Sequence, residues 1–457
     1  MNLEQLRKQA KELVRAARAG DPAALERLGG REPILARVQL AVAREHGYSS
    51  WPALVAAAEA DAEAFVLAAT DGRRARAQAL LAARPEEIRA DPWARLVLGE
   101  GWDGDPNAPG GPRAWAPLSY VCHSQFASAA LAAQLLARGA DPDVTFPNEY
   151  GDMSALYGAA GVVHDPDLTR VLLEAGANPD DGESVYHATE APSPACLALL
   201  IEHGAQVNGT NALAHALDDE RLEHVRLLLE AGFDVGDGAL VAHAVRRGRG
   251  PEVLRLLAAF GADVDRPGGE TWRGAVPLRT PYQHAVLRGR GDVAAVLAEL
   301  GADRSVADAD RAVAAVARGA RPAVALPAAP DVDQQEVLIL AALDGHLDAV
   351  VDAVGPDFRG VVGGSPVLPL LGHAAWFGRA DVVDRLLARG ADPLARGDAA
   401  FATPLAIAML GSQGHTVAGR DYVAVAERLV AAGNELEDRF AGVADGPLAE
   451  WLDARTG

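Results

Sequence analysis

The sequence predicts an all-α solenoid, a stack of helix–turn–helix units that spans most of the chain. The first observation is a recurring phrase: a helix of small residues, a second apolar helix, and then Gly-Ala-Asp or a close variant. The second is its spacing of roughly 28–40 residues, which is typical of stacked-repeat proteins. The phrase reads LLARGADPD at 135–143, LLEAGANPD at 172–180, LIEHGAQVN at 200–208, LLEAGFDVG at 228–236, LLAAFGADVD at 256–265, LAELGADRS at 297–305 and LLARGADPL at 386–394.

Residues 371–390 show how one unit is expected to fold. They hold an Ala-rich first helix, a Gly-containing turn and a second helix with apolar residues at i, i+3 and i+4. Ala374 and Ala375 let neighbouring helices approach closely, and Gly390 is expected to end the second helix in the left-handed conformation. A single unit cannot bury its apolar face alone, so we expect each unit to stack on its neighbours.

Several segments match parts of one longer pattern, T-P-L-H-x-A-A-x-x-G-H. They are Ala116-Pro117-Leu118, Thr280-Pro281, Thr403-Pro404-Leu405 and Ala341-Ala342-Leu343-Asp344-Gly345-His346. On these matches the units resemble ankyrin repeats. The resemblance covers about ten or eleven units between residues 61 and 435, with a degenerate unit near 306–330. It implies finger-like loops between units and a protein or peptide as the usual ligand.

The two ends of the chain lack the repeat. Residues 1–60 are expected to form a helical N-terminal cap, and residues 436–457 a C-terminal capping helix anchored by Leu448 and Trp451. Within the first segment, 39–60 resembles a leader that often precedes ankyrin arrays in bacterial proteins. Caps would cover the apolar faces that the end repeats otherwise expose. An independent binding role for the N-terminal segment is the alternative.

Composition and charge narrow the classes of partner. The formal net charge of −21 argues against a nucleic-acid backbone or an anionic membrane as the main partner. The N-terminus has no apolar signal region, and no later segment has the length and purity of a membrane span. Cys122 and Cys196 fall in different repeats and predict no disulfide framework. We expect a cytoplasmic protein with no cofactor.

The sharpest prediction concerns the first helices. With each unit numbered from its Thr-equivalent, positions 3, 6 and 7 form the buried stripe, and positions 5, 8 and 9 face the concave groove. A histidine at position 5 in consecutive units would build a ladder of imidazoles along that groove. If the register were one residue earlier, each histidine would be the structural histidine of the T-P-L-H-x-A-A pattern. In that pattern a variable residue separates the histidine from the alanine, whereas here an alanine directly follows each histidine. The position 5 histidines are His187, His215, His243, His284 and His373.

The third unit is expected to leave a small-ligand pocket. Gly158 and Gly161 stand at positions 5 and 8, so the unit presents almost no side chain to the groove. A concave dent with convergent polar groups is the usual form of a ligand site. The expected walls and lid are Tyr120, His123, His187, Glu190 and Trp115.

Two histidine–carboxylate pairs, His187–Glu190 and His215–Asp218, have i, i+3 spacing within a helix. A nearby carboxylate favours the charged imidazole, so either pair suits general base or hydrogen-bond work. The same spacing could bind a divalent metal, but no compact tetrahedral set of ligands appears. We expect no metal site.

The longer connections carry aromatic and basic residues. Trp115 lies in 99–117, Phe146 and Tyr150 in 144–152, and Trp272 in 265–279. Long loops with aromatic residues favour ligand contact, although each Trp could instead fold back onto its own loop. A further candidate, in the sixth and seventh units and the loop between them, is a positive patch that could bind anions. The alternative is that its arginines pair with neighbouring carboxylates. The patch comprises Arg246, Arg247, Arg273 and Arg288.

The favoured function is non-covalent recognition of a protein or peptide partner through the concave groove and finger loops. The competing function is small-molecule binding or catalysis, with the histidines in general acid–base chemistry; no Walker pattern or nucleophile elbow supports an enzyme. The catalytic candidates are His187, His215, Glu190 and Asp218. The ligand-binding candidates are Tyr120, His123, His187, His215, His243, Arg246, His284, Trp115 and Trp272.

Overall fold

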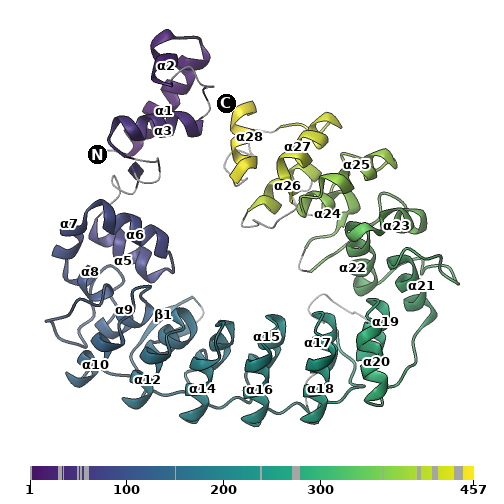
Figure 1. Cartoon of the computed structure of the whole chain (residues 1–457), viewed down its shortest axis with the longest axis horizontal. Coiled ribbons are helices and arrows are strands. Elements are labelled where there is room, and N and C mark those ends of the chain that lie inside the picture. The colour runs from purple at the N-terminus through teal and green to yellow at the C-terminus, as the bar shows by residue number, and fades with distance from the viewer. Residues whose placement is uncertain are drawn as a thin grey trace. The chain divides into compact units, whose positions relative to one another are not determined.

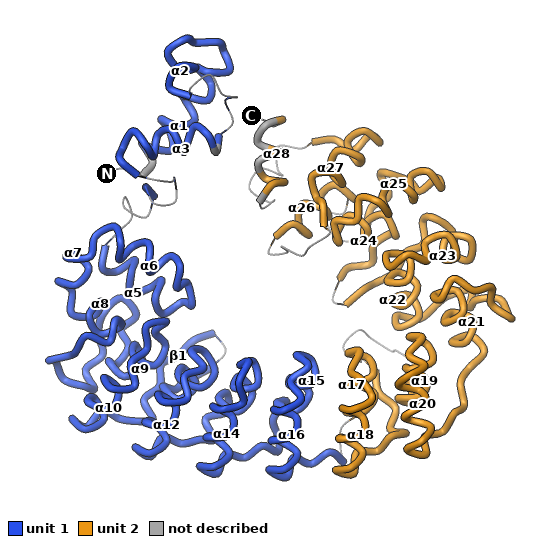
Figure 2. Tube along the Cα trace, in the orientation of Figure 1, with its two compact units in different colours: residues 1–237 blue, residues 238–457 orange. Residues whose placement is uncertain are grey.

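The structure is a computed structural model in which the chain divides into two compact units, Met1–Asp237 and Gly238–Gly457 (Figure 2). Helices dominate both units, and the named strands of the described residues form two short hairpins (Figure 1). The residues described are 3–28, 33, 35–48, 51, 54–55, 61–149, 151–236, 239–269, 278–363, 365–398, 403–413, 420–436 and 446–456.

The first unit alternates first and second helices. First helices pack on the first helices of adjacent repeats, and second helices do the same. Its helices are α1 (Leu3–Arg18), α2 (Pro22–Arg27), α3 (Leu35–Glu45), α5 (Ala62–Thr70), α6 (Arg74–Ala83), α7 (Pro85–Ala90), α8 (Pro92–Val97), α9 (Pro117–His123), α10 (Ala129–Ala137), α11 (Ala155–Tyr157), η1 (Gly158–Val163), α12 (Pro166–Glu174), α13 (Ser184–His187), η2 (Ala188–Glu190), α14 (Ala195–Glu202), α15 (Ala212–Asp218) and α16 (Leu222–Glu230). The hairpin β1 (Thr145–Asn148) and β2 (Gly151–Ser154) is antiparallel and precedes α11.

Helices α1 to α3 form a cluster of their own. The buried apolar residues of this cluster run from Leu6 in α1 to Leu54, which follows α3. Asp21 begins α2 as an N-cap, because its Oδ1 accepts a 2.9 Å hydrogen bond from the Ala24 amide. The role of residues 1–60 as a cap stays a prediction, and 1–2, 29–32, 34, 49–50, 52–53 and 56–60 lie outside the described residues.

The second unit continues the alternation. Its helices are α17 (Leu240–Arg246), α18 (Pro251–Ala259), α19 (Pro281–Leu287), α20 (Gly291–Glu299), α21 (Asp308–Ala317), α22 (Val332–Ala341), η4 (Ala342–His346), α23 (Leu347–Val354), α24 (Leu370–Trp376), α25 (Ala380–Ala388), α26 (Pro404–Ser412), α27 (Tyr422–Ala431) and α28 (Gly446–Thr456). The strands β3 (Arg359–Gly360) and β4 (Leu368–Pro369) pair antiparallel before α24. After α21, residues 318–331 contain no helix. The degenerate repeat near 306–330 therefore has its first helix, α21, but no second helix.

The Thr-Pro dipeptides begin first helices, as the pattern predicts. At α19, Thr280 Oγ1 accepts from the Gln283 amide while Gln283 Oε1 accepts from the Thr280 amide. This reciprocal capping satisfies two amides that the helix leaves without partners. Thr403 caps α26 in the same position, and proline follows each threonine at the first helical residue, where its missing N–H costs nothing.

Glycines end the second helices. Gly390 has a φ of 85°, which confirms the predicted left-handed conformation. The next amide, that of Ala391, donates a 3.0 Å hydrogen bond to the Leu386 carbonyl and closes the helix end.

A ladder of side-chain hydrogen bonds joins successive turns. In each step, an Asp or Asn oxygen at the end of one recurring phrase or its equivalent accepts from a backbone amide of the next repeat, at 2.6–2.9 Å. We call this the turn ladder. Its steps are Asp143 to Asn178, Asp180 to Gln206 and Asn208 to Asp234 in the first unit, and Asp265 to Asp303 and Asp357 to Asp392 in the second.

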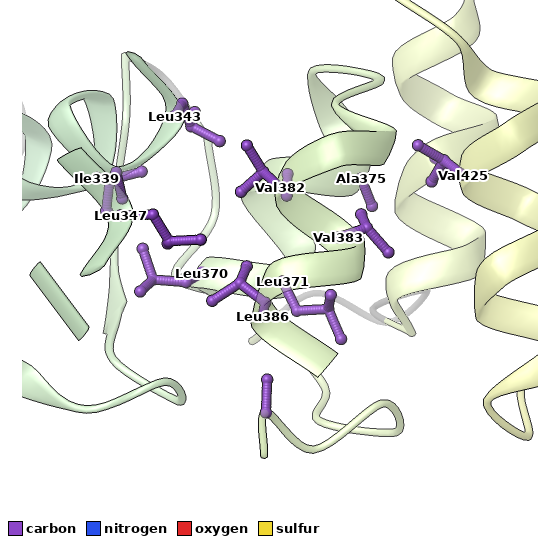
Figure 3. Packing of buried hydrophobic residues seen from close by; sticks show 14 of the residues in the cluster. Ile339, Leu343, Leu347, Leu370, Leu371, Ala375, Val382, Val383, Leu386 and Val425 are labelled. Carbon is purple, nitrogen blue, oxygen red and sulfur yellow. The ribbon is translucent and has the colours of Figure 1, made fainter. Parts of the chain in front are cut away.

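Apolar side chains from adjacent repeats share one core in the second unit (Figure 3). Leu347 of α23 and Leu386 of α25 are fully buried in it. Leu448 and Trp451 of α28 also belong to this core, and Trp451 Nε1 donates to Glu427 of α27 at 3.1 Å. Burying these two anchors fixes α28 on the last repeat. Among the described residues, no helix is both long and apolar enough to cross a bilayer.

Candidate functional site

Long connections cover the position 5 side chains that follow them. Tyr120 Oη donates to the Gly110 carbonyl at 2.9 Å. His284 Nε2 donates to the Gly268 carbonyl at 2.8 Å, and His373 Nε2 to Gly360 at 3.0 Å. These three side chains are at most 1% exposed. Each side chain therefore anchors the loop that precedes its helix through this hydrogen bond.

Glycine lets these loops approach the preceding helix. A Cβ at Gly268 would lie 2.7 Å from the Ala239 Cβ, and one at Gly360 would lie 2.9 Å from the Gln335 Cβ. A Cβ at Gly110 would meet the ring of Trp93. Real side chains avoid such distances, so a glycine at the loop's point of contact is required.

The prediction that Tyr120, His284 and His373 face the groove is therefore wrong. Helical periodicity identifies the face of a helix but not whether a loop lies over it. The signal that could have separated them is loop length: long connections precede these residues, whereas short ones precede His187 and His215.

The predicted dent in the third unit is filled. A Cβ at Gly158 would lie 2.5 Å from the His123 ring, and one at Gly161 would lie 2.7 Å from the His187 Cβ. The glycines thus admit neighbouring side chains instead of leaving a hollow. His123 is 4% exposed, so the prediction that it contacts a ligand is also wrong.

The His123 ring is neutral near pH 7 because it is buried. Its Nδ1 donates to the Ser119 carbonyl at 2.9 Å, and its Nε2 is buried without a hydrogen-bond partner. Burial lowers the pKa of His123 to about 4, with a smaller lowering from Arg113 and an opposing rise from the Ser119 contact.

Trp115 packs against a second loop instead of covering a pocket. Its ring stacks on Phe146 of β1 with centroids 3.7 Å apart. The guanidinium of Arg113 lies 4.8 Å from the same ring. The alternative that each Trp folds back onto its own loop therefore describes Trp115 only in part, because Arg113 belongs to that loop and Phe146 to the next one. Tyr150, Trp272 and Arg273 lie outside the described residues.

Four rings remain half-exposed in consecutive repeats of the first unit, and we call them the exposed row: Tyr157, His187, Tyr186 and His215. Adjacent centroids are 5.1 Å apart for Tyr157–His187, 4.8 Å for Tyr186–His187 and 4.4 Å for Tyr186–His215. The predicted neighbours His187 and His215 are thus brought together. Sequence reasoning missed the two tyrosines, which lie beside the numbered groove positions.

Glu190 links the two histidines. Its Oε1 lies 2.8 Å from His187 Nδ1 and 3.9 Å from His215 Nε2. The predicted His187–Glu190 pairing is confirmed. On its other side, His187 Nε2 lies 3.3 Å from Glu183 Oε2. Thr189 contacts His215 Nδ1 at 2.8 Å, so His215 is held by the preceding repeat.

A groove of about 550 Å³ runs beside the exposed row between two neighbouring turns, and we call it the turn groove. It is lined by Pro179, Asp180, Gly182, Glu183, Val185 and Tyr186 on one side and by Gln206, Asn208, Gly209, Thr210 and Asn211 on the other. Tyr186 belongs to both features. Burial raises the pKa of Tyr186, and carboxylates headed by Glu190 and Asp218 raise it further.

The predicted positive patch in the second unit is paired with carboxylates. Arg288 donates to Glu336 at 2.8 Å, and Arg246 Nε lies 3.7 Å from Asp333 Oδ1. The alternative in which these arginines pair with neighbours therefore applies to both. His243 is half-buried, and Arg247 is exposed.

Arg279 lies at the centre of that buried cluster. It is 5% exposed and donates to both oxygens of Asp310 at 2.9 Å. It also donates to Asp331 at 2.6 Å and to Asp333 at 3.2 Å. Burial would raise the pKa of Asp310, but hydrogen bonds from Arg279 and Gln334 outweigh it, so the pKa lies below its usual value. Within the described ranges, no three His, Cys, Asp or Glu residues are grouped as metal ligands.

The known proteins to which this chain is similar share its repeats. Residues 156–239, which include the whole exposed row, match the family model for ankyrin repeats in three copies. No curated protein matches the sequence. Among solved structures, the human ASB11 ankyrin repeat domain is 19% identical with a TM-score of 0.37, covering 53% of this chain and 99% of its own.

Two further structures are similar. The ankyrin repeat domain of Bcl-3, a member of the IkappaB family, is 25% identical with a TM-score of 0.33, covering 41% of this chain and 87% of its own. An ankyrin repeat domain from Acinetobacter baumannii is 25% identical with a TM-score of 0.34, covering 41% and 98%.

Proposed function

Because this chain contains ankyrin repeats, which are generally protein–protein interaction modules, we propose that its first unit binds a protein partner. The binding surface is the exposed row together with the turn groove. Short connections precede α13 and α15, so no long loop covers their position 5 side chains.

One observation carries the proposal. Four rings from consecutive repeats remain half-exposed and form a continuous row. The centroids of adjacent rings in the row are at most 5.1 Å apart. Aromatic side chains contribute large contact areas at low entropic cost and are enriched where partners bind. The adjoining turn groove offers a concave surface for an extended segment.

A random peptide library displayed on phage, selected against the full chain, tests the proposal. We expect enriched peptides to lose binding to a variant carrying Tyr186→Ala, His187→Ala and His215→Ala. The matched control is His203→Ala, an exposed histidine at the end of α14. Equal melting temperatures of the chain and the variant would exclude loss of folding as the cause. Peptides that bind the triple variant unchanged would place recognition elsewhere.

Small-molecule binding with acid–base chemistry is the second candidate function. The observation in its favour is Glu190 Oε1 between two imidazoles, at 2.8 Å and 3.9 Å. A carboxylate that orients an imidazole is a common part of general acid–base sites. Melting temperatures measured across a metabolite collection would test it: a ligand that stabilises the chain but not Glu190→Gln supports it. No such ligand leaves the protein-binding proposal as the sole candidate.

A further inference from the structure

The charge around the exposed row is one-sided. Residues 171–220 contain nine Asp or Glu residues and no Lys or Arg. This stretch includes every lining residue of the turn groove and three of the four rings of the exposed row. The whole chain has 42 Lys and Arg against 63 Asp and Glu, so a run of fifty residues without a cation is a local property of this surface.

Structural duties account for part of this negative charge. Asp180 holds the Gln206 amide in the turn ladder, and Asp181 accepts from both Ser154 and Ser184. Glu183 and Glu190 differ, because each directs one oxygen toward His187 and keeps 39% and 37% of its side chain exposed. Their carboxylates lie on either side of the histidine and are reachable from solvent.

Tyr186 supplies an aromatic face among these carboxylates. Its ring is half-exposed, borders the turn groove and lies 4.8 Å and 4.4 Å from the imidazoles of His187 and His215. A cation gains both from the face of an aromatic ring and from carboxylates beside it. Arg221, the first arginine after this stretch, donates to the Glu190 backbone carbonyl at 3.3 Å.

We propose that the partner presents a basic segment, with an arginine side chain laid on Tyr186 and paired with Glu183 and Glu190. This inference rests on the proposed function and adds the chemistry of the partner. Arginine fits better than lysine because its planar guanidinium stacks on a ring while donating to carboxylates at its edge. An acidic partner would instead meet repulsion from the nine carboxylates of this stretch, which itself contains no Lys or Arg.

Three fluorescein-labelled octapeptides, in which Gly alternates with Arg, Gln or Glu, test the proposal by fluorescence anisotropy on the full chain. We expect binding of the Arg peptide, weakening as salt rises, and no binding of the other two. Tyr186→Leu keeps an apolar side chain but removes the ring. It should weaken the Arg peptide at least about five-fold.

The paired carboxylates have a matched control. Glu183→Gln with Glu190→Gln should weaken binding of the Arg peptide at least about five-fold. Glu174→Gln with Glu202→Gln removes the same charge from exposed positions on α12 and α14 and should change affinity less than about two-fold. Equal weakening by both double variants would reduce the effect to net charge and overturn the proposal. Binding of the Gln peptide, or none of the Arg peptide, would also overturn it.

The display selection separates the two proposals. Enriched peptides that need the exposed row but lack basic residues would preserve the proposed function and overturn this inference. A failure to enrich any peptide that needs the exposed row would overturn the proposed function itself. Enrichment of Arg-containing peptides that lose binding to Tyr186→Leu supports both.

Discussion

The imidazole of His123 packs directly on the backbone of Gly158 in the next repeat. A Cβ added at Gly158 would lie 2.5 Å from two atoms of that ring and 2.9 Å from the Cys122 carbonyl oxygen. Both partners are buried, so neither can move into solvent to make room. Close stacking of the second and third repeats of this unit therefore depends on a missing side chain.

Gly158→Ala should destabilise the chain by about 1–3 kcal/mol, because an extra methyl group in a close-packed site forces the backbone apart. Urea unfolding followed by circular dichroism measures this change. Gly291→Ala is the matched control, since a Cβ there meets nothing within 4 Å and its φ is not in the left-handed region. Equal midpoints for the two variants would show that His123 can move aside.

Two of the buried histidines, His123 and His284, should make stability depend on pH. Burial lowers the pKa of His123 to about 4 and the pKa of His284 to about 3, against an ordinary value of 6.5. The folded values lie below the unfolded one, so the unfolded chain binds more protons between them. Stability is then fully present above about pH 6.5 and declines as pH falls toward 4 and 3.

His284→Gln should reduce that decline. Between pH 6.5 and 5, each buried histidine costs roughly 2 kcal/mol, because one pH unit corresponds to about 1.4 kcal/mol. Glutamine can still donate to the Gly268 carbonyl but does not titrate. Unfolding free energies measured at pH 7 and pH 5 should differ less for His284→Gln than for the unaltered chain. An unchanged difference would show that His284 gains a proton without leaving its site.

Arg279→Met should be among the most damaging substitutions, at about 3–5 kcal/mol, because it leaves buried carboxylates without their cation. Arg255→Met is its control: the Arg255–Glu299 pair is 53% and 64% exposed, and such surface pairs contribute about 0–1 kcal/mol. Thermal unfolding of both variants at pH 7 provides the comparison. A small effect at Arg279 would mean that Asp310, Asp331 or Asp333 takes up a proton when the guanidinium is absent.

Asp180→Ala should loosen one step of the turn ladder. The substitution removes the acceptor of the 2.6 Å hydrogen bond from the Gln206 amide and should cost about 1 kcal/mol. Hydrogen exchange read by mass spectrometry should show faster exchange at Gln206. Asp143→Ala is the reciprocal control, since its partner is the Asn178 amide. Faster exchange at both amides in either variant would contradict independent steps.

Local rules predicted the helix–turn–helix repeat. The Thr280 cap, the Gly390 helix end and the His187–Glu190 pair each depend on residues close in sequence, so spacing alone identifies them. Burial of Tyr120 and His284 depends instead on loops that fold back over 10 and 16 residues. Periodicity within a helix carries no information about such a cover.

The candidate site was predicted in part for the same reason. Spacing identified His187, His215 and Glu190, which the structure brings together. It missed Thr189 as a partner of His215, because that contact crosses from one repeat to the next. It also treated Gly158 as an opening, although a glycine beside a large ring in a stacked array admits that ring.

In the first unit, two neighbouring repeats each hold one donor and one acceptor of the turn ladder: the Asn178 amide with the Asp180 carboxylate, and the Gln206 amide with the Asn208 side-chain oxygen. A repeat that is duplicated or deleted between equivalent points carries both with it. The two repeats that become neighbours can then form the same hydrogen bond at their junction, and no second substitution is needed to restore it. In this part of the first unit, the ladder therefore makes the number of repeats open to change by recombination, while each repeat keeps its direction along the chain.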